Sequence, residues 1–340
     1  MNKSTVKKRF GQYFTTNSHY VLSNLIGDMP QEATIVDPFC GDSDLLKLFP
    51  HHHTIGLDIN PQNNNIKKNN SFREFDYENK WVVSNPPYLA RNKNKTKNLY
   101  DDYKTDDYYK IFFLTLLKSK PCGGIAIVPT NFFCSDSKRI IISFISEFEI
   151  IRLNMFEEPV FEDTSQSVCS FSFRRKPNNI CQSLEVNFFP QKKSITTTIE
   201  KKHSYIIGNE FFDYIDHDNP VKIGRLEKDK FPWAPNTKMF LSVLDTSKSL
   251  ELRLDDYYYG IKTDRAFATI VLPFWLSYKD QQFVCDEFNK IINYYREEYN
   301  SMFLTTYREA KGGKIRKRIS FRNAYKLISK IIIDNHLKKT

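Results

Sequence analysis

The sequence contains no apolar run that approaches the roughly 18 residues needed to cross a membrane. Its first residues, MNKSTVKKRF, lack the apolar core of a signal peptide. These absences predict a protein without a membrane partner, and they make the cytoplasm the expected compartment.

Cysteine is sparse and irregularly placed. The six cysteines are scattered along the chain, and no two of them form a C-x-x-C pair. This spacing argues against a disulfide framework and against a zinc site. The three consecutive histidines at 51–53 precede an expected strand and lack partner ligands, so we expect no metal.

The chain is long enough for two domains, and its excess positive charge lies in one half. With 340 residues, of which 40% are hydrophobic and 26% charged, the composition is typical of a globular protein with two cores. Residues 1–170 carry 20 Lys and Arg against 20 Asp and Glu, whereas residues 171–340 carry 30 against 20. The stretch 307–330 holds nine basic residues and one acidic residue with aromatic residues between them. This density favours nucleic-acid contact over a solvated helix face.

Short apolar runs alternate with helical spacing in the first half. We expect strands at 33–37, 53–58, 81–84 and 124–129, helices at 43–49 and 106–119, and a hairpin of 149–156 with 167–175. This rhythm predicts an α/β fold with a doubly wound, mostly parallel sheet. Beyond residue 176 the rhythm is lost, and helical spacing is convincing only at 286–336. We therefore expect a domain at 1–175 and a smaller one at 176–340.

Polar residues end four successive strands: Asp37, Asp58, Asp76 and Asn85. The turn after Asp37, DPFCGDS, is not the G-x-G-x-x-G of a dinucleotide site, so a pyrophosphate would lack its bed of glycines. An acidic strand end instead suits a ligand with an ammonium group, and the second carboxylate can accept two ribose hydroxyls. A single strand-terminal Asp also fits a helix N-cap, but the ordered series is harder to explain by capping.

The last of these strands runs into NPPY at 85–88. Its two prolines remove two backbone donors and end the strand, so Asn85 and Tyr88 lie at a strand's carboxyl end. Ligands bind at that edge of an open α/β sheet. Asn-Pro-Pro is equally an ordinary turn, and the motif alone does not separate the two interpretations.

Five stretches together resemble the amino-group DNA methyltransferases that use S-adenosylmethionine, in the N6-adenine class. They are GQYFT (11–15), VDPFCGDSDL (36–45), GLDIN (56–60), FDY (75–77) and NPPY (85–88). The resemblance covers roughly residues 1–175, and NPPY by itself is shared with protein-glutamine and some RNA methyltransferases. One departure is Ser43, which stands where the family commonly has a second glycine after Gly41.

The resemblance implies the class I methyltransferase fold and a set of residues that bind S-adenosylmethionine. That set is Gln12, Tyr13, Phe14, Thr15, Asp37, Phe39, Gly41, Asp58, Ile59, Asp76 and Asn85. In such enzymes the 11–15 stretch closes over the methionine end, and Asp37 and Gly41 hold the amino acid part. Asp58 takes the ribose hydroxyls and Asp76 the adenine amino group. No metal is implied.

The resemblance also implies the catalytic residues Asn85, Pro86, Pro87 and Tyr88. Asn85 Oδ1 and the Pro86 carbonyl would each accept one hydrogen of the adenine N6 amino group, so that its lone pair faces the sulfonium methyl. In-line transfer then depends on positioning and electrostatic preorganisation. The adenine must first leave the duplex, and Tyr88 and Phe161 would stack on its two faces. A plain hydrophobic plug remains open as the role of Phe161.

The order of the motifs is similar to the gamma arrangement, in which target recognition follows NPPY. Residues 176–340 would then be a target-recognition domain for double-stranded DNA. The expected DNA contacts are Arg91, Lys93, Lys262, Arg265, Lys314, Arg316, Lys317 and Arg318. Most of these would contact phosphates, which position DNA without specifying its sequence.

The function expected from the sequence is site-specific DNA adenine-N6 methylation in a restriction-modification system, whose endonuclease would act separately. The expected target is a short palindrome containing adenine. CATG is suggested because NPPYLARNK and RKRISF look similar to enzymes that methylate it. An RNA base methyltransferase, a protein-glutamine methyltransferase and a catalytically silent DNA-binding module remain as alternatives. The glutamine enzymes usually carry a substrate domain before the cofactor domain, and the intact strand-end residues disfavour a silent module.

Overall fold

The computed structural model describes most of the chain. The described residues are 15, 17–134, 139–161, 167–176, 182–218, 220–226, 236–245, 248–256, 266–309 and 315–337. The chain divides into two compact units, unit 1 at Met1–Tyr205 and unit 2 at Ile206–Thr340.

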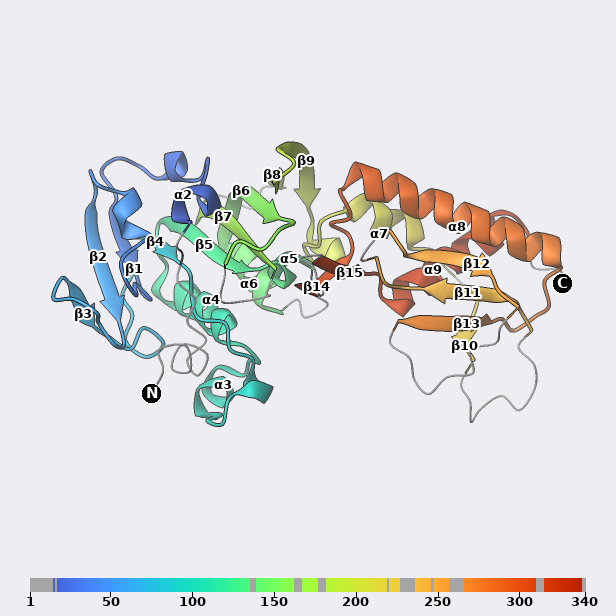
Figure 1. Ribbon diagram of the computed structural model, residues 1–340, viewed down its shortest axis with the longest axis horizontal. Coiled ribbons are helices and arrows are strands. Elements are labelled where there is room, and N and C mark those ends of the chain that lie inside the picture. Colours follow the sequence, from blue (N-terminus) through green and yellow to red (C-terminus); the bar gives the residue numbers. More distant parts are fainter. Residues whose placement is uncertain are drawn as a thin grey trace. The chain divides into compact units, whose positions relative to one another are not determined.

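Unit 1 is built on a nine-stranded sheet with the order β3-β2-β1-β4-β5-β7-β6-β8-β9 (Figure 1). Its strands are β1 (Thr34–Asp37), β2 (His53–Asp58), β3 (Ile66–Lys68), β4 (Trp81–Ser84), β5 (Gly123–Pro129), β6 (Phe148–Phe156), β7 (Val168–Arg175), β8 (Gln182–Phe189) and β9 (Lys193–Ile199). The first five strands run parallel, whereas β7 is antiparallel to both β5 and β6. This confirms the doubly wound, mostly parallel sheet and the antiparallel hairpin predicted from the sequence.

The helices of unit 1 are short apart from one that precedes β5. They are α2 (Ser18–Val21), α3 (Asn98–Tyr103), α4 (Tyr108–Ser119), α5 (Asn131–Cys134) and α6 (Arg139–Glu147), with 3-10 turns η1 (Ile26–Asp28), η2 (Leu46–Leu48), η3 (Arg91–Lys93) and η4 (Lys201–His203). The long helix α4 confirms the helix expected at 106–119 and makes the crossover between the parallel strands β4 and β5.

The alternation of side chains along β7 explains why both faces of the sheet are covered. Successive side chains of a strand point to opposite faces. Ser172 points to one face, where its hydroxyl donates to the Asp28 carboxylate at 2.6 Å. Phe171 points to the other face, where its ring stacks on Phe132 at 5.8 Å and meets Phe144 edge-on at 6.2 Å. The polar face therefore meets η1, and the aromatic face meets α5 and α6.

Two expectations for the first half differ from the structure. The predicted helix at 43–49 is wrong, because this segment consists of turns and the single 3-10 turn η2. Ser43 has a φ of 65°, which a right-handed helix does not accommodate. In addition, β8 pairs in parallel with β6 and continues the sheet beyond residue 176. The boundary between the compact units therefore lies at 205/206, later than the expected 175/176.

Unit 2 combines antiparallel strands with helices in its described part. A four-stranded sheet has the order β10-β13-β11-β12, and β14 pairs with β15 in a separate hairpin. The elements are α7 (Asn209–Ile215), β10 (Gly224–Arg225), β11 (Met239–Ser242), β12 (Glu251–Leu254), β13 (Phe267–Val271), α8 (Tyr278–Glu298), β14 (Thr305–Glu309), β15 (Ile315–Arg318) and α9 (Phe321–Asp334). The helical spacing expected over 286–336 holds only at its two ends, because the hairpin interrupts it.

A buried ion pair ties α8 to the rest of unit 2. The Arg296 guanidinium on α8 donates to both oxygens of Asp245, from Nη2 at 2.8 Å and from Nε at 3.2 Å. The backbone N–H of Asp245 donates to the Lys317 carbonyl at 2.8 Å. Because Asp245 follows β11 by three residues and Lys317 lies on β15, the pair links α8, the four-stranded sheet and the hairpin.

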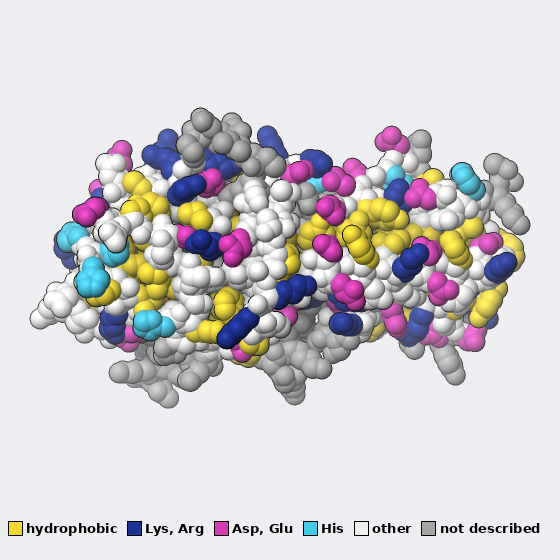
Figure 2. Space-filling model, turned by 90° about the horizontal axis from the view of Figure 1, so that it is seen from above, with side chains coloured by type: hydrophobic (Ala, Val, Ile, Leu, Met, Phe, Trp, Pro, Cys, Tyr) yellow, Lys and Arg dark blue, Asp and Glu magenta, His cyan; other side chains and the backbone are white. Residues whose placement is uncertain are grey.

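The outer face of α8 carries side chains of mixed character. Tyr278, Phe283 and Tyr294 are exposed by 60%, 38% and 56%. Figure 2 shows hydrophobic side chains on this side of unit 2 interspersed with acidic and basic ones, so positive charge is not gathered there into one patch. Among the described residues, no helix has both the length and the apolar character needed to cross a bilayer.

Candidate active site

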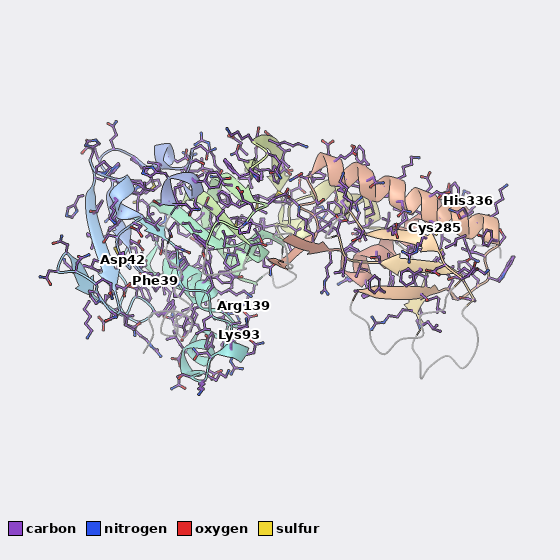
Figure 3. All side chains as sticks on the ribbon, in the orientation of Figure 1. Phe39, Asp42, Lys93, Arg139, Cys285 and His336 are labelled. Carbon is purple, nitrogen blue, oxygen red and sulfur yellow. The ribbon has the colours of Figure 1, made fainter. Side chains whose placement is uncertain are left out.

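A cavity of about 350 Å³ lies at the carboxyl ends of β1, β2 and β4. Its lining residues are Thr15, Asp37, Phe39, Cys40, Gly41, Asp42, Asp44, Leu45, Asp58, Ile59, Asn69, Asn70, Ser71, Phe72, Arg73, Asn85, Pro87, Thr96, Asn98, Leu99 and Tyr108. β1 pairs with β2 on one side and with β4 on the other, so the strand order reverses at this edge. The cavity brings together Asp37, Asp58 and Asn85, and Figure 3 labels two further lining residues, Phe39 and Asp42.

Asp37 ends β1 and is almost completely buried, with 1% of its surface exposed. Its Oδ1 accepts the Phe39 N–H at 3.0 Å and the Ser84 hydroxyl at 3.3 Å. Burial, and to a smaller extent the Asp58 carboxylate, raise the pKa of Asp37 to about 7, although these two hydrogen bonds oppose the shift. A cationic group in the cavity would favour the charged form of this carboxyl.

Asp58 ends β2 and fixes the turn that follows β1. Its Oδ2 accepts the Gly41 N–H at 3.0 Å, and its Oδ1 accepts the Asn60 N–H at 2.8 Å. A carboxylate can accept about four hydrogen bonds, so both oxygens keep capacity for ligand hydroxyls. The carboxylate therefore shapes the cavity and can also bind within it.

The turn between β1 and η2 depends on two residues with positive φ. Gly41 has a φ of 51° and Ser43 a φ of 65°. Glycine adopts this region without a steric penalty, whereas a residue with a Cβ pays about 1 kcal/mol or more. The position where the sequence departs from the family pattern is therefore one where the backbone itself favours glycine.

The structure does not bring Asp76 to the cavity. The Asp76 side chain is 77% exposed, and its Oδ2 lies 3.3 Å from Lys80 Nζ. The third strand of the sheet ends earlier than expected, at Lys68, so the residues at its carboxyl end are 69–71, which line the cavity. Asn69 Nδ2 donates there to Ser71 Oγ at 2.9 Å. Sequence reasoning missed this segment because β3 has only three residues, of which one is buried.

Asn85 is held in a defined orientation at the end of β4. Its Nδ2 donates to the hydroxyl of Thr15 at 3.1 Å, and its Oδ1 accepts a hydrogen bond from the Tyr88 hydroxyl. The amide oxygen of Asn85 is a hydrogen-bond acceptor with two lone pairs. Thr15 is the last residue of the 11–15 stretch, and residues 11–14, with Gln12, Tyr13 and Phe14, lie outside the described residues.

The two aromatic residues expected to stack on a base are both buried. Tyr88 is 7% exposed, and its hydroxyl also lies 2.8 Å from the Ile127 carbonyl. Phe161 is 4% exposed. Neither residue is among those that line the cavity, nor is the buried Pro86, whereas Pro87 is. Stacking on a base would require the Tyr88 ring to become uncovered.

The expected DNA contacts lie in both units. Arg91 and Lys93 belong to η3 in unit 1, and Lys317 and Arg318 lie on β15 in unit 2. Lys317 Nζ donates to the Asn300 carbonyl at 3.2 Å. The remaining expected contacts, Lys262, Arg265 and Lys314, lie outside the described residues, as does the side chain of Arg316.

The fold and the cavity define an open α/β protein with a cavity at the point where the strand order reverses. Residues 39–161 match the family model described as Eco57I restriction-modification methylase. The matched segment contains the turn after β1, Asp58 and NPPY, and it supports a methyltransferase of the restriction-modification type. A search of curated proteins found no match.

Solved structures of restriction-modification proteins are similar at low identity. A modification subunit from Vibrio vulnificus YJ016 is 16% identical, with a TM-score of 0.43, over 60% of this chain and 52% of that chain. A type I methyltransferase subunit from Streptococcus thermophilus is 13% identical, with a TM-score of 0.37, over 53% of this chain and 48% of that chain. The type IIG restriction endonuclease BpuSI is 13% identical, with a TM-score of 0.41, over 70% of this chain and 38% of that chain. The chain spans about half the length of such structures, and these likenesses decide neither substrate nor mechanism.

Replacing Ser43 by glycine should raise the free energy of unfolding by about 1 kcal/mol. Glycine has no Cβ, so it adopts the φ of 65° without the steric cost that serine pays. Chemical denaturation measures this change. The same substitution at Ser146, within α6, should lower stability by about 0.5–1 kcal/mol and serves as the control. A destabilised Ser43→Gly variant would contradict the strain assigned to this turn.

Proposed function

We propose that this chain transfers a methyl group from S-adenosylmethionine to the N6 amino group of adenine in double-stranded DNA, as the modification enzyme of a restriction-modification system. The observation that carries the proposal is the meeting of Asp37, Asp58 and Asn85 at one cavity. Asp58 and Asn85 lie in the segment 39–161 that matches the restriction-modification methylases, and Asp37 precedes that segment by two residues.

The residues around the cavity fit S-adenosylmethionine in charge and character. Its volume of about 350 Å³ lies within the usual range of small-molecule sites. Asp37 offers a buried carboxylate to the ammonium group, and Asp58 keeps acceptor capacity for the ribose hydroxyls. Phe39 and Phe72, whose ring centroids are 4.9 Å apart, form an apolar wall suited to adenine. Asn70, which lines the cavity, would contact the cofactor's adenine amino group in place of Asp76.

The residues at the end of β4 would activate the adenine amino group. S-adenosylmethionine supplies an electrophilic methyl group on its sulfonium. An exocyclic adenine nitrogen is a weak nucleophile because its lone pair is delocalised into the ring. Asn85 Oδ1 and the Pro86 carbonyl would each accept an N6 hydrogen and so direct the lone pair out of the ring plane. The bond from Asn85 Nδ2 to Thr15 fixes which side of the amide presents the oxygen. This pre-orientation is the main catalytic contribution we assign to the chain.

The target adenine would be flipped out of the duplex and held by stacking. We assign one face of the base to Tyr88 and the other to Phe161. Because both side chains are buried in the protein alone, base entry would be coupled to their exposure. Extrusion of the base costs a few kcal/mol, and these aromatic contacts would offset part of it.

We assign target recognition to unit 2, which carries the basic hairpin β14–β15. Lys317 and Arg318 would contact phosphates of the DNA, with Arg316, Lys314, Lys262 and Arg265 as further expected contacts. We propose a short palindrome containing adenine as the target, with CATG as the first sequence to test. A separately acting endonuclease with the same target is the partner that such a system requires.

The pH dependence of cofactor binding tests the role of Asp37. The carboxyl takes up a proton as the pH falls through about 7 and then loses the charge that meets the ammonium group. Binding of S-adenosylmethionine should therefore weaken as the pH falls below this value. Titration calorimetry should also show that Asp37→Asn binds more weakly and with a flatter pH profile. An affinity of the unchanged protein that does not vary around pH 7 would contradict this role.

Asn85→Ala should lower the rate of methyl transfer to DNA by about 100-fold or more, because it removes an acceptor from the reacting amino group. Affinity for S-adenosylmethionine should change little. Transfer of a radiolabelled methyl group measures the rate, and hydrolysis of the product identifies the methylated base. Asn64→Ala, at an exposed residue outside the cavity lining, is the control. Full activity of Asn85→Ala would refute the mechanism, and label in RNA or glutamine instead of adenine would refute the substrate.

Tyr88→Phe separates the hydroxyl of Tyr88 from its ring. The variant keeps a stacking surface but loses the hydrogen bond to Asn85. We expect the turnover rate to fall by about 5- to 30-fold, since a lost hydrogen bond to a buried acceptor costs about 1–2 kcal/mol. Tyr88→Ala should lose more activity, because stacking is removed as well. Equal rates for Tyr88→Phe and the unchanged protein would show that the hydroxyl has no part in positioning Asn85.

A further inference from the structure

A second cavity in unit 1, of about 560 Å³, has a lining rich in basic side chains. Its charged residues are Arg91, Lys104, Lys110, Arg139, Asp101 and Asp106. Among the described lining residues, four cationic side chains face two carboxylates, which is an excess of two positive charges. We refer to it as the basic groove. Arg139, which Figure 3 labels, lies in the part of unit 1 where Figure 1 labels α4, since both figures have the same orientation.

The two carboxylates of the basic groove are matched to two of its cations. Arg91 Nη2 lies 2.5 Å from Asp101 Oδ1, and Lys110 Nζ lies 2.8 Å from Asp106 Oδ1. The Lys110 side chain is only 11% exposed, so its ammonium group is held in place against the groove wall. Among the described lining residues, these pairs leave the excess positive charge on Lys104 and Arg139.

Arg139 and Lys104 are held beside each other. Arg139 Nη2 donates to the Tyr103 carbonyl at 3.4 Å and to the Lys104 carbonyl at 3.3 Å. Carbonyl oxygens orient a guanidinium without cancelling its charge. Lys104 follows α3 with a φ of 51°, which turns the chain there and places its exposed side chain at the groove. The pair therefore forms an oriented cationic site that suits an anion.

The basic groove is built on the backbone that follows NPPY. Ala90 forms a β-bridge with Asp107, and the Arg91 N–H donates to the Asp106 carbonyl at 2.7 Å. A tyrosine pair links the groove to the active-site cavity. Tyr100 lines the groove, Tyr108 lines the cavity, and their rings stack with centroids 4.9 Å apart and planes 13° apart. The groove therefore lies directly behind one wall of the proposed catalytic site.

We propose that the basic groove binds a backbone phosphate of the DNA strand that carries the target adenine. The inference rests on the proposed function and extends it to Lys104, Lys110 and Arg139. A phosphate held there would anchor the strand close to NPPY while the base leaves the duplex. Arg139 suits this role because a guanidinium can donate two parallel hydrogen bonds to a phosphate. Such a contact positions the DNA and does not read its sequence.

The salt dependence of DNA binding tests the basic groove. The probe is a short duplex of mixed sequence, because phosphate contacts do not require the recognition site. The logarithm of the binding constant falls with the logarithm of the salt concentration, by about 0.9 for each neutralised phosphate. Lys104→Gln combined with Arg139→Gln should weaken binding and reduce this slope by about 0.9, the value for one phosphate. Arg139→Lys, which keeps the charge, should retain the slope.

Lys120→Gln is the matched control, since Lys120 is an exposed lysine just beyond the other end of α4. It should leave the salt slope unchanged. Affinity for S-adenosylmethionine shows that each variant is folded, and the exposed Lys104→Gln alone serves if the double variant is not. An unchanged slope in a folded groove variant overturns the inference, and so does an equal loss in the Lys120 control. If the unchanged protein methylates DNA while the groove variants keep its salt slope, the groove assignment fails and the proposed function stands.

Discussion

Burial of the Asp37 carboxyl beside Asp58 is the constraint on which the cavity depends. In the folded protein burial raises the pKa of Asp37 from 3.8 to about 7, so the proton is held more tightly than in the unfolded chain. The contribution of this group to stability is therefore lost as the pH rises from about 4 to 7. A cationic ligand group offsets this cost when it meets the ionised carboxylate. Burial of Asp37 thus lowers the stability of the ligand-free protein when the carboxyl is ionised, and it favours binding of a cationic ligand.

The turn after β1 likewise combines a stabilising hydrogen bond with an unfavourable backbone conformation. Asp58 accepts the Gly41 N–H and so closes the turn over the end of β1, while Ser43 occupies a backbone region that favours glycine. Further along the sheet, Thr15 and Tyr88 hold the two ends of the Asn85 amide. Asp58 and Asn85 are thus held by protein partners before any ligand binds. Such preorganisation is what group transfer without a covalent intermediate requires.

The sequence was sufficient for features that depend on local pattern. Apolar runs gave β1, β2, β4 and β5, and the polar residues at three strand ends meet at one cavity. The sequence was insufficient for features that depend on contacts between residues far apart in the chain. The strand β3 is too short to recognise from sequence. The pattern therefore places Asp76 at the end of the third strand, whereas residues 69–71 follow β3 and line the cavity. The burial of Tyr88 depends on contacts such as that with the Ile127 carbonyl, 39 residues away. Helical spacing at 286–336 could not reveal that pairing of β14 with β15 interrupts it.

The central claim is that the residues at the end of β4 present an adenine amino group for methylation. The most direct measurement is to produce the protein in a host without adenine methylation and to map modified bases across the host DNA. The account predicts N6-methyladenine at one short sequence, and its absence when Asn85→Ala is produced instead. Host DNA without N6-methyladenine, although the protein is folded and binds S-adenosylmethionine, would contradict it.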